Sequence, residues 1–274
     1  MVVGRGRLTF GTNMVGTNKN LGQHWLKNRA ILDEIADLAA EESAYGFSDS
    51  RGDGAKVCLE IGPGLGTLTS SLLRRFEKVI AVEYDERLAG NLPKSFPGKN
   101  LEVLNQDILK FDFSTIKEKY VIAGNIPYYI TSPIIERILL AEWRPERAVL
   151  LIQKEVAERI VDKKETMLSL FVKNRAEINL GPVVVKGEFT PPPKVDSQVI
   201  ILRPREKPEV GDDVFGIIKM GFLAPRKKLI HNLSGLKSKE ELTKIFSEIG
   251  LSIDVRPGDL GLRDWEKLYL SLSA

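Results

Sequence analysis

Three glycines follow the apolar segment 57–61 at alternate positions: Gly62, Gly64 and Gly66. Glycine has no side chain, so its main chain can approach a ligand closely, and a helix that begins after such a turn offers free N–H groups to it. The spacing is G-x-G-x-G, whereas the dinucleotide-binding turn has G-x-G-x-x-G. The pattern therefore predicts a cofactor-binding turn and disfavours a nicotinamide oxidoreductase.

Carboxylates follow the next two apolar segments. Glu83 lies 21 residues after Gly62 and ends segment 79–83, where a carboxylate can accept hydrogen bonds from both hydroxyls of a ribose. Asp107 follows segment 101–105, and it could accept from an adenine amino group while the adjacent main-chain N–H reaches a ring nitrogen. Three consecutive segment ends thus predict a cofactor that contains adenosine.

The fourth segment ends in Asn125, Ile126, Pro127 and Tyr128. Alkylation of an exocyclic amine on a base is difficult because the nitrogen lone pair is delocalised into the ring. Two acceptors on the amino hydrogens, the side-chain carbonyl of Asn125 and the main-chain carbonyl of Pro127, could pull the nitrogen toward tetrahedral geometry. Proline keeps the chain rigid there, and Tyr128 offers a face for base stacking. No strong base is required, because the nitrogen proton becomes acidic once the methyl group is attached.

Short apolar segments that alternate with helical or loop segments must hold these residues. The predicted strands are 57–61, 79–83, 101–105, 120–124 and 147–153. Near-continuous apolar strands of this kind predict a parallel sheet covered on both faces. Segments 177–186 and 197–203 have no helix between them, so we expect an antiparallel pair at the sheet edge. A charged linker with prolines follows at 203–213, and helical patterns begin near Val214, Lys227, Ser238 and Arg263.

Composition excludes several classes of protein. The chain has 274 residues, a formal net charge of +3 and one cysteine, Cys58, which rules out an internal disulfide and a multi-cysteine metal site. We expect no metal. The longest apolar run, 148–152, is too short to span a bilayer, and the first thirty residues lack a secretory apolar core. These features predict a cytoplasmic protein without a membrane partner.

The first residues carry charge of one sign. Five cations and no acid occur up to Leu32, which suits a polyanion, although an ordinary solvated terminus has the same composition. We expect three regions: a basic flexible arm at 1–19, the main domain at 20–203 and a small helical domain at 204–274.

Five ordered motifs together resemble the KsgA family of ribosomal RNA adenine N6,N6-dimethyltransferases. They are 20–26 (NLGQHWL), 60–69 (EIGPGLGTLT), 124–128 (GNIPY), 153–156 (QKEV) and 189–197 (FTPPPKVDS), with a weaker match at 224–228 (APRKK). The resemblance implies a class I, Rossmann-like methyltransferase with a mostly parallel seven-stranded sheet, an antiparallel edge strand and a small C-terminal all-helical domain. It implies S-adenosyl-L-methionine as the cofactor.

The resemblance also implies roles for single residues. Gln23, His24 and Leu26 would close over the cofactor, whose methionine part would lie on Gly62 and Gly64. Ribose would bind Glu83, adenine would bind Asp107 and Ile108, and Asn125 would touch both cofactor and target. Catalysis would involve Asn125, Pro127, Tyr128 and Phe189, with Phe189 stacked on a flipped base opposite Tyr128.

The implied substrate is two adjacent adenosines in the 3′-terminal hairpin of small-subunit (16S) ribosomal RNA, each methylated twice by a monomer acting on an immature 30S-type particle. The chain departs from the family pattern at 165–169 (ETMLS), where an arginine near the RNA is missing, and at Ala224 and Pro225. Arg226, Lys227 and Lys228 fit phosphate contacts, although a solvated helix face is the simpler alternative.

Two other functions stay open at this point. Erm-type methyltransferases of large-subunit RNA share the 125–128 and 22–24 motifs, although they tend to have a lysine in the glycine turn and a histidine after the phenylalanine that corresponds to Phe189. A non-catalytic nucleic-acid-binding relative of the same fold is the second alternative, and the intact 125–128 segment and Phe189 argue against it.

Overall fold

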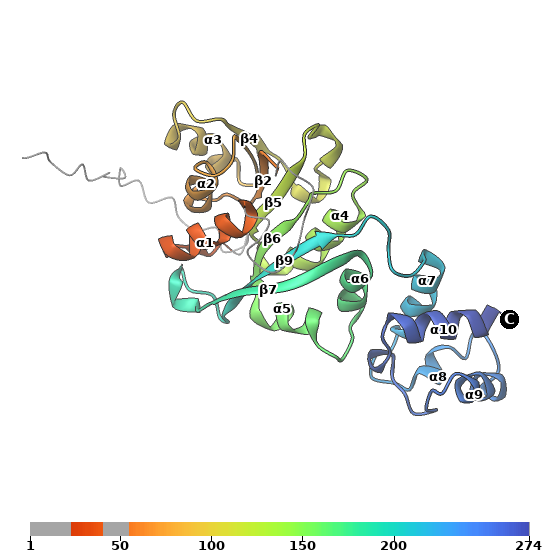
Figure 1. Ribbon diagram of the computed structural model, residues 1–274. Coiled ribbons are helices and arrows are strands. Elements are labelled where there is room, and N and C mark those ends of the chain that lie inside the picture. The colour runs from red at the N-terminus through yellow and green to blue at the C-terminus, as the bar shows by residue number, and fades with distance from the viewer. Residues whose placement is uncertain (1–22, 41–54, 274) are drawn as a thin grey trace, which may run out of the picture.

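The structure is a computed structural model that describes residues 23–40 and 55–273. The predicted basic arm at 1–19 and residues 20–22 of the first motif lie outside the described residues. A seven-stranded sheet with the order β4-β3-β2-β5-β6-β9-β7 forms the centre of the larger lobe (Figure 1). Its strands are β2 (Val57–Ile61), β3 (Lys78–Glu83), β4 (Leu101–Asn105), β5 (Tyr120–Asn125), β6 (Ala148–Gln153), β7 (Ala176–Val184) and β9 (Ser197–Pro204).

Strands β2 to β6 are mutually parallel, which confirms the predicted doubly covered sheet. The helices of the larger lobe are α1 (Arg29–Ala40), α2 (Thr67–Leu72), α3 (Glu86–Ser95), α4 (Thr131–Leu140), α5 (Lys154–Val161) and α6 (Met167–Arg175). Helices α1 and α2 pack with one sheet face, and α4, α5 and α6 pack with the other. Alternate residues of a strand point to opposite faces of the sheet. Cys58 therefore packs in the core beneath α1 and α2, and Leu59 packs in the core beneath α4, α5 and α6.

The predicted antiparallel pair at the sheet edge is also present. Strand β9 lies between β6 and β7 and runs antiparallel to both. A register irregularity between Leu180 and Val183 interrupts the β7–β9 pairing. Since β7 occupies the edge, only one side of it pairs within the sheet.

A second, two-stranded sheet was not predicted. Strand β1 (Trp25–Leu26) pairs antiparallel with β8 (Phe189–Thr190), and Lys27 N donates to the Glu188 carbonyl at 3.0 Å. This pairing joins segments more than 160 residues apart, so it brings the start of the described chain to the loop that precedes β9.

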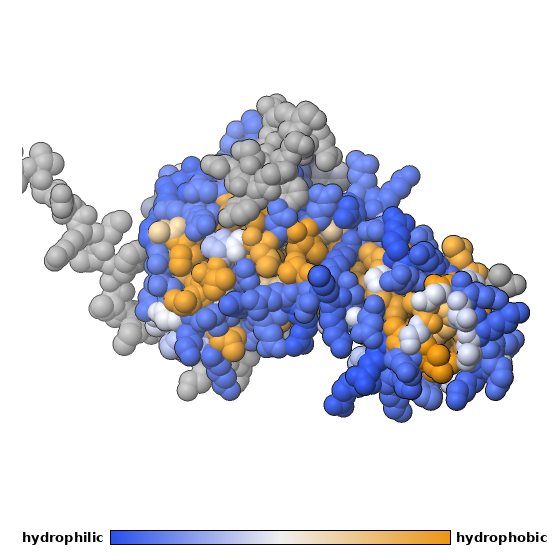
Figure 2. Space-filling model, turned by 60° about the horizontal axis from the view of Figure 1, so that its bottom comes forward, coloured by the Kyte–Doolittle hydropathy of each residue, from blue (hydrophilic) through white to orange (hydrophobic). Residues whose placement is uncertain are grey.

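The smaller lobe is helical, as predicted. It contains α7 (Asp212–Gly221), α8 (Leu229–Asn232), α9 (Lys239–Glu248) and α10 (Leu262–Ser273), and its core surrounds the fully buried Trp265. Figure 2 shows hydrophilic residues on the surface between apolar areas of the two lobes. Within the described ranges, no helix is long and apolar enough to cross a membrane.

The two lobes share contacts through α6. Leu170 of α6 belongs to the core of the smaller lobe. The buried Asn174 side chain accepts from Val210 N at 2.7 Å and donates to the Val210 carbonyl at 3.2 Å, and Arg175 pairs with Asp212 at 2.7 Å. The chain between the lobes is therefore tied to the larger lobe rather than running free.

Candidate active site

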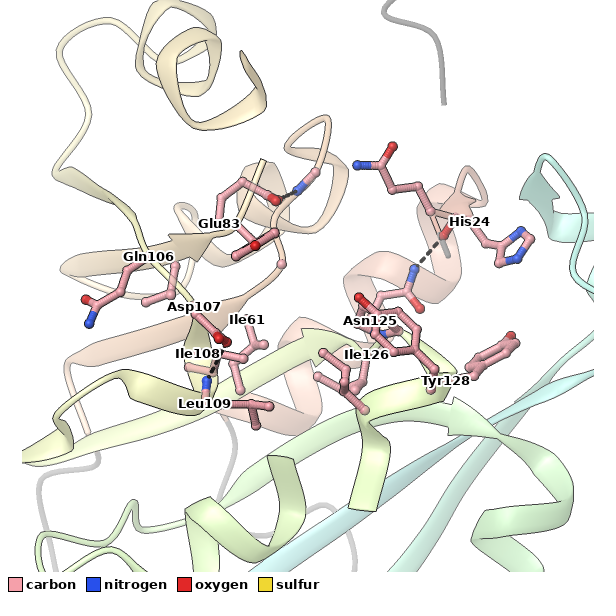
Figure 3. A pocket seen from close by; sticks show the side chains of 18 of the residues that line it. His24, Ile61, Glu83, Gln106, Asp107, Ile108, Leu109, Asn125, Ile126 and Tyr128 are labelled. Carbon is pink, nitrogen blue, oxygen red and sulfur yellow. Dashed lines mark hydrogen bonds between the residues drawn. The ribbon is translucent and has the colours of Figure 1, made fainter. Parts of the chain in front are cut away.

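A cavity of about 350 Å³ lies where the parallel strands end at their carboxyl edge. Its lining comes from the ends of β2, β3 and β5, the turn after β4 and the segment at β1: Gln23, His24, Trp25, Ile61, Gly62, Gly64, Val82, Glu83, Tyr84, Gln106, Asp107, Ile108, Leu109, Asn125, Ile126, Pro127, Tyr128, Tyr129 and Ile130. Figure 3 shows Glu83 and Asp107 toward one end, and His24, Asn125 and Tyr128 toward the other. Ligands bind at this edge in open α/β sheets.

The glycine turn after β2 has the backbone that its sequence requires. Gly62, Gly64 and Gly66 have φ angles of 65°, 58° and 80°, in the left-handed region that favours glycine. A Cβ on Gly64 would lie 3.1 Å from the indole nitrogen of Trp25, and one on Gly66 would lie 2.7 Å from a Leu92 methyl carbon. Side chains in this turn would therefore push against the cavity wall and against α3.

Glu83 is 7% exposed and turns its carboxylate toward the glycine turn. One oxygen accepts from Gly64 N at 3.0 Å, drawn dashed in Figure 3, and the other accepts from Asp85 N at 2.8 Å. Burial raises the pKa of the Glu83 carboxyl, although these two N–H groups favour its charged form. Each oxygen retains a further lone pair, so a pair of hydroxyl groups can bind there.

Asp107 begins the short 3₁₀ helix Ile108–Lys110 and lines the same end of the cavity. One of its oxygens accepts from Leu109 N at 2.9 Å, which fixes the side chain and leaves the second oxygen as an acceptor. The neighbouring walls are the apolar side chains of Ile61, Ile108 and Leu109. This end of the cavity combines an acceptor with flat apolar surface, as a purine requires.

The Asn125 side chain at the end of β5 has a determined orientation. Its Nδ2 donates to the main-chain carbonyl of His24 at 2.8 Å, and that carbonyl can only accept. The side-chain oxygen of Asn125 is therefore left as an acceptor at the cavity. The carbonyl of Pro127 already accepts from Ile130 N at 3.1 Å, so one of its two lone pairs remains for a second donor.

The half-buried Tyr128 ring is held on two sides. Its hydroxyl shares a hydrogen bond of 2.7 Å with the buried Ser197 hydroxyl at the start of β9. The His24 ring stacks beside it, with centroids 6.1 Å apart and planes inclined by 25°. Burial raises the pKa of Tyr128, so the hydroxyl is neutral at ordinary pH.

Two predicted residues lie elsewhere. Phe189 is 2% exposed and Leu26 is 1% exposed; the two are partners in the β1–β8 register, and both belong to the core beneath α1. Successive strand residues point to opposite sides, so Phe189 faces the core while Thr190 is exposed. The structure thus does not bring Phe189 opposite Tyr128, and Leu26 does not line the cavity; its neighbour Trp25 does.

Sequence reasoning missed three aromatic side chains of the cavity. Trp25 lies in the 20–26 motif, and Tyr84 and Tyr129 directly follow Glu83 and Tyr128. Tyr84 and Tyr129 are 65% and 61% exposed, so they stand at the mouth. The available signal was that each of these aromatic residues is adjacent in sequence to a predicted site residue.

Comparison with known proteins decides the family. A family model described as ribosomal RNA adenine dimethylase matches residues 14–272. A ribosomal RNA small subunit methyltransferase A from Lactobacillus johnsonii is 36% identical over 273 residues, covering 91% of this chain and 88% of that protein. The chain belongs to the ribosomal RNA adenine dimethylase family. The predicted resemblance is confirmed.

A second curated relative and two solved structures are similar over most of their length. The protein of the same description from Thermosynechococcus vestitus is 37% identical over 264 residues, covering 92% of this chain and 95% of that one. Among solved structures, a dimethyladenosine transferase from Plasmodium falciparum has a TM-score of 0.73 at 29% identity, covering 91% of this chain and 98% of that one. The 23S rRNA methyltransferase ErmE has a TM-score of 0.70 at 26% identity, covering 91% and 100%. The class I methyltransferase fold is thereby confirmed, and fold similarity alone does not separate the two RNA substrates.

Proposed function

We propose that the protein transfers methyl groups from S-adenosyl-L-methionine to N6 of two adjacent adenosines in the 3′-terminal hairpin of small-subunit ribosomal RNA, two groups to each. It acts as a monomer in the cytoplasm on an immature small-subunit particle. The observation that carries the proposal is the fixed acceptor at Asn125, beside a cavity whose other end suits an adenosine.

The cavity fits the cofactor at each part. Because Gly64 has no side chain, the glycine turn leaves room for the methionine part of the cofactor and presents N–H groups to it. Gln23 and His24 lie over that part. The Glu83 carboxylate binds the ribose hydroxyls, and Asp107 with the Ile108 main chain binds the adenine. When bound, S-adenosylmethionine supplies an electrophilic methyl group.

The residues at the other end bind the acceptor. A flipped adenine stacks on Tyr128, which offsets part of the few kcal/mol that base extrusion costs. In the first transfer, the Asn125 oxygen and the remaining lone pair of the Pro127 carbonyl accept the two amino hydrogens. In the second transfer the methylated amine has one hydrogen left, which the Asn125 oxygen accepts. These bonds draw the nitrogen lone pair out of conjugation and direct it toward the methyl group. The amino proton is lost to water after transfer, so the chain needs no general base.

The smaller lobe supplies a cationic surface for RNA. Arg226, Lys227 and Lys228 are exposed before α8, and Lys228 forms an ion pair with Asp254. Arg226 and Lys227 are therefore the stronger candidates for phosphate contacts. Such contacts orient the protein on RNA without reading its sequence.

The alternative is an Erm-type substrate in large-subunit RNA, with which the fold similarity to ErmE is equally compatible. The higher identity to small-subunit methyltransferases over most of the chain favours the 16S substrate. A tritiated methyl-transfer assay separates the two. We expect label on small subunits that lack the modification and none on large subunits; label on large subunits alone would contradict the proposal.

A further inference from the structure

Three parts of the acceptor site meet at one residue, His24. Its main-chain carbonyl accepts from Asn125 Nδ2 at 2.8 Å, its ring stacks beside Tyr128, and its Nδ1 lies 2.8 Å from the Pro191 carbonyl. In sequence, 101 residues separate His24 from Asn125 and 167 separate it from Pro191. Figure 3 shows His24, Asn125 and Tyr128 together at the acceptor side of the cavity, away from Glu83 and Asp107.

The contact with Pro191 determines which nitrogen of the His24 ring carries a proton and how the ring is oriented. A main-chain carbonyl can only accept, so Nδ1 must carry a proton and donate it. This bond fixes the plane of the imidazole, and the plane in turn fixes where the ring meets Tyr128. The Tyr128 ring is then restrained at one face by His24 and at its hydroxyl by Ser197.

The restraint matters because a base stacks productively on Tyr128 only if that ring is already oriented. An exposed tyrosine rotates about two side-chain bonds, and ordering it on binding costs free energy. A ring held from two sides has lost that freedom before RNA arrives, which places the base amine within reach of Asn125.

We propose that His24 is a positioning residue of the acceptor site, which orients Tyr128 through its ring and holds the segment directly after β8 through the bond from its Nδ1–H to the Pro191 carbonyl. This inference rests on the proposed function, because it assumes that Tyr128 receives the base. It assigns to His24 a role in the transfer step beyond covering the cofactor.

Three substitutions separate the contacts, and all three keep the main-chain carbonyl that binds Asn125. His24→Ala removes ring and donor. His24→Asn keeps a donor, because the Asn amide nitrogen is as many bonds from Cα as Nδ1 is. His24→Phe keeps a ring without the donor. A fourth variant, Ser197→Ala, removes the hydrogen bond to the Tyr128 hydroxyl and changes the packing volume little.

The measurements are kcat and KM for undermethylated small subunits at saturating cofactor, and the Kd of S-adenosylhomocysteine by calorimetry. We expect His24→Ala to lower kcat on the order of tenfold, because the base stack on Tyr128 is weakened rather than lost, and to leave the Kd within about twofold. His24→Asn and His24→Phe should each recover part of the loss, and Ser197→Ala should lower kcat with an unchanged Kd.

A weaker Kd for His24→Ala, with the wild-type rate restored by excess cofactor, would overturn the proposal, since His24 would then be only a cofactor contact. Unchanged kcat in both His24→Ala and Ser197→Ala would also overturn it. If wild-type protein fails to methylate small subunits at all, the proposed function has failed instead, so the two failures are distinguishable.

Discussion

Replacement of Glu83 by glutamine tests the cofactor end of the cavity. The substitution keeps the shape of the side chain, but it removes the charge and turns an amide NH₂ toward either Gly64 N or Asp85 N, both of which are donors. Hydrogen bonds to charged groups contribute about 1.5–3 kcal/mol each. We therefore expect the Kd of S-adenosylhomocysteine to rise on the order of 10- to 100-fold.

Calorimetry measures this Kd, with Glu86→Gln as the matched control because Glu86 is exposed on α3. A thermal melt without ligand checks that the Glu83 variant folds. The pH dependence has a definite sign: ligand hydroxyls need the ionised carboxylate, and burial raises the pKa of Glu83, so affinity falls as pH falls through that pKa. An unchanged Kd in Glu83→Gln, or the same loss in Glu86→Gln, would refute the assignment.

Three further outcomes follow from the same contacts. Neutralising both Arg226 and Lys227 should flatten the log–log salt dependence of RNA binding by about 1.4–1.8 units, with Lys99→Gln, on the surface of the larger lobe, as the control. An unaltered slope would show that the two side chains form only a solvated face. Phe189→Ala should lower the free energy of unfolding by about 3–5 kcal/mol, as core truncations do, while Phe189→Leu should methylate at close to the wild-type rate. Loss of methyl transfer in a stable Phe189→Leu protein would instead indicate that Phe189 stacks on the target base. Burial raises the pKa of Glu60 from 4.5 to about 8. Between these two values the folded state binds one proton more than the unfolded state, so the free energy of unfolding falls with rising pH, by up to about 1.4 kcal/mol per pH unit. Urea denaturation of Glu60→Gln should lack that slope, and an identical slope would show that Glu60 is not its source.

Local sequence pattern was enough for most of the larger lobe. Segments such as 79–82 and 148–152 are apolar on both faces, which only a doubly covered strand accommodates. Glu83, Asp107 and Asn125 each lie at or just after the end of such a strand. Parallel strands place their carboxyl ends at one edge, so position along the chain converts directly into proximity. The glycine turn was predictable for the same reason.

The other half of the cavity depends on pairing between distant segments. The sequence of residues 23–26 and 189–190 does not predict the β1–β8 pair, because strands of two residues are too short to show the alternation of apolar and polar residues that is typical of a strand. That pair decides which of Trp25 and Leu26 faces the cavity and turns Phe189 into the core. The family resemblance assigned Phe189 and Leu26 to the site, and the register of this small sheet places them elsewhere.

The central claim is that the Asn125 oxygen accepts a hydrogen from the adenine amine during methyl transfer. Its most direct test is single-turnover transfer to undermethylated small subunits by Asn125→Ala, with the modified nucleosides identified by mass spectrometry. Loss of one transition-state hydrogen bond predicts transfer slowed on the order of 10²-fold or more, with RNA affinity little changed. Dimethyladenosine formed by the variant at the wild-type rate would contradict the mechanism, and methylation of cytosine or guanine by the wild-type protein would contradict the substrate.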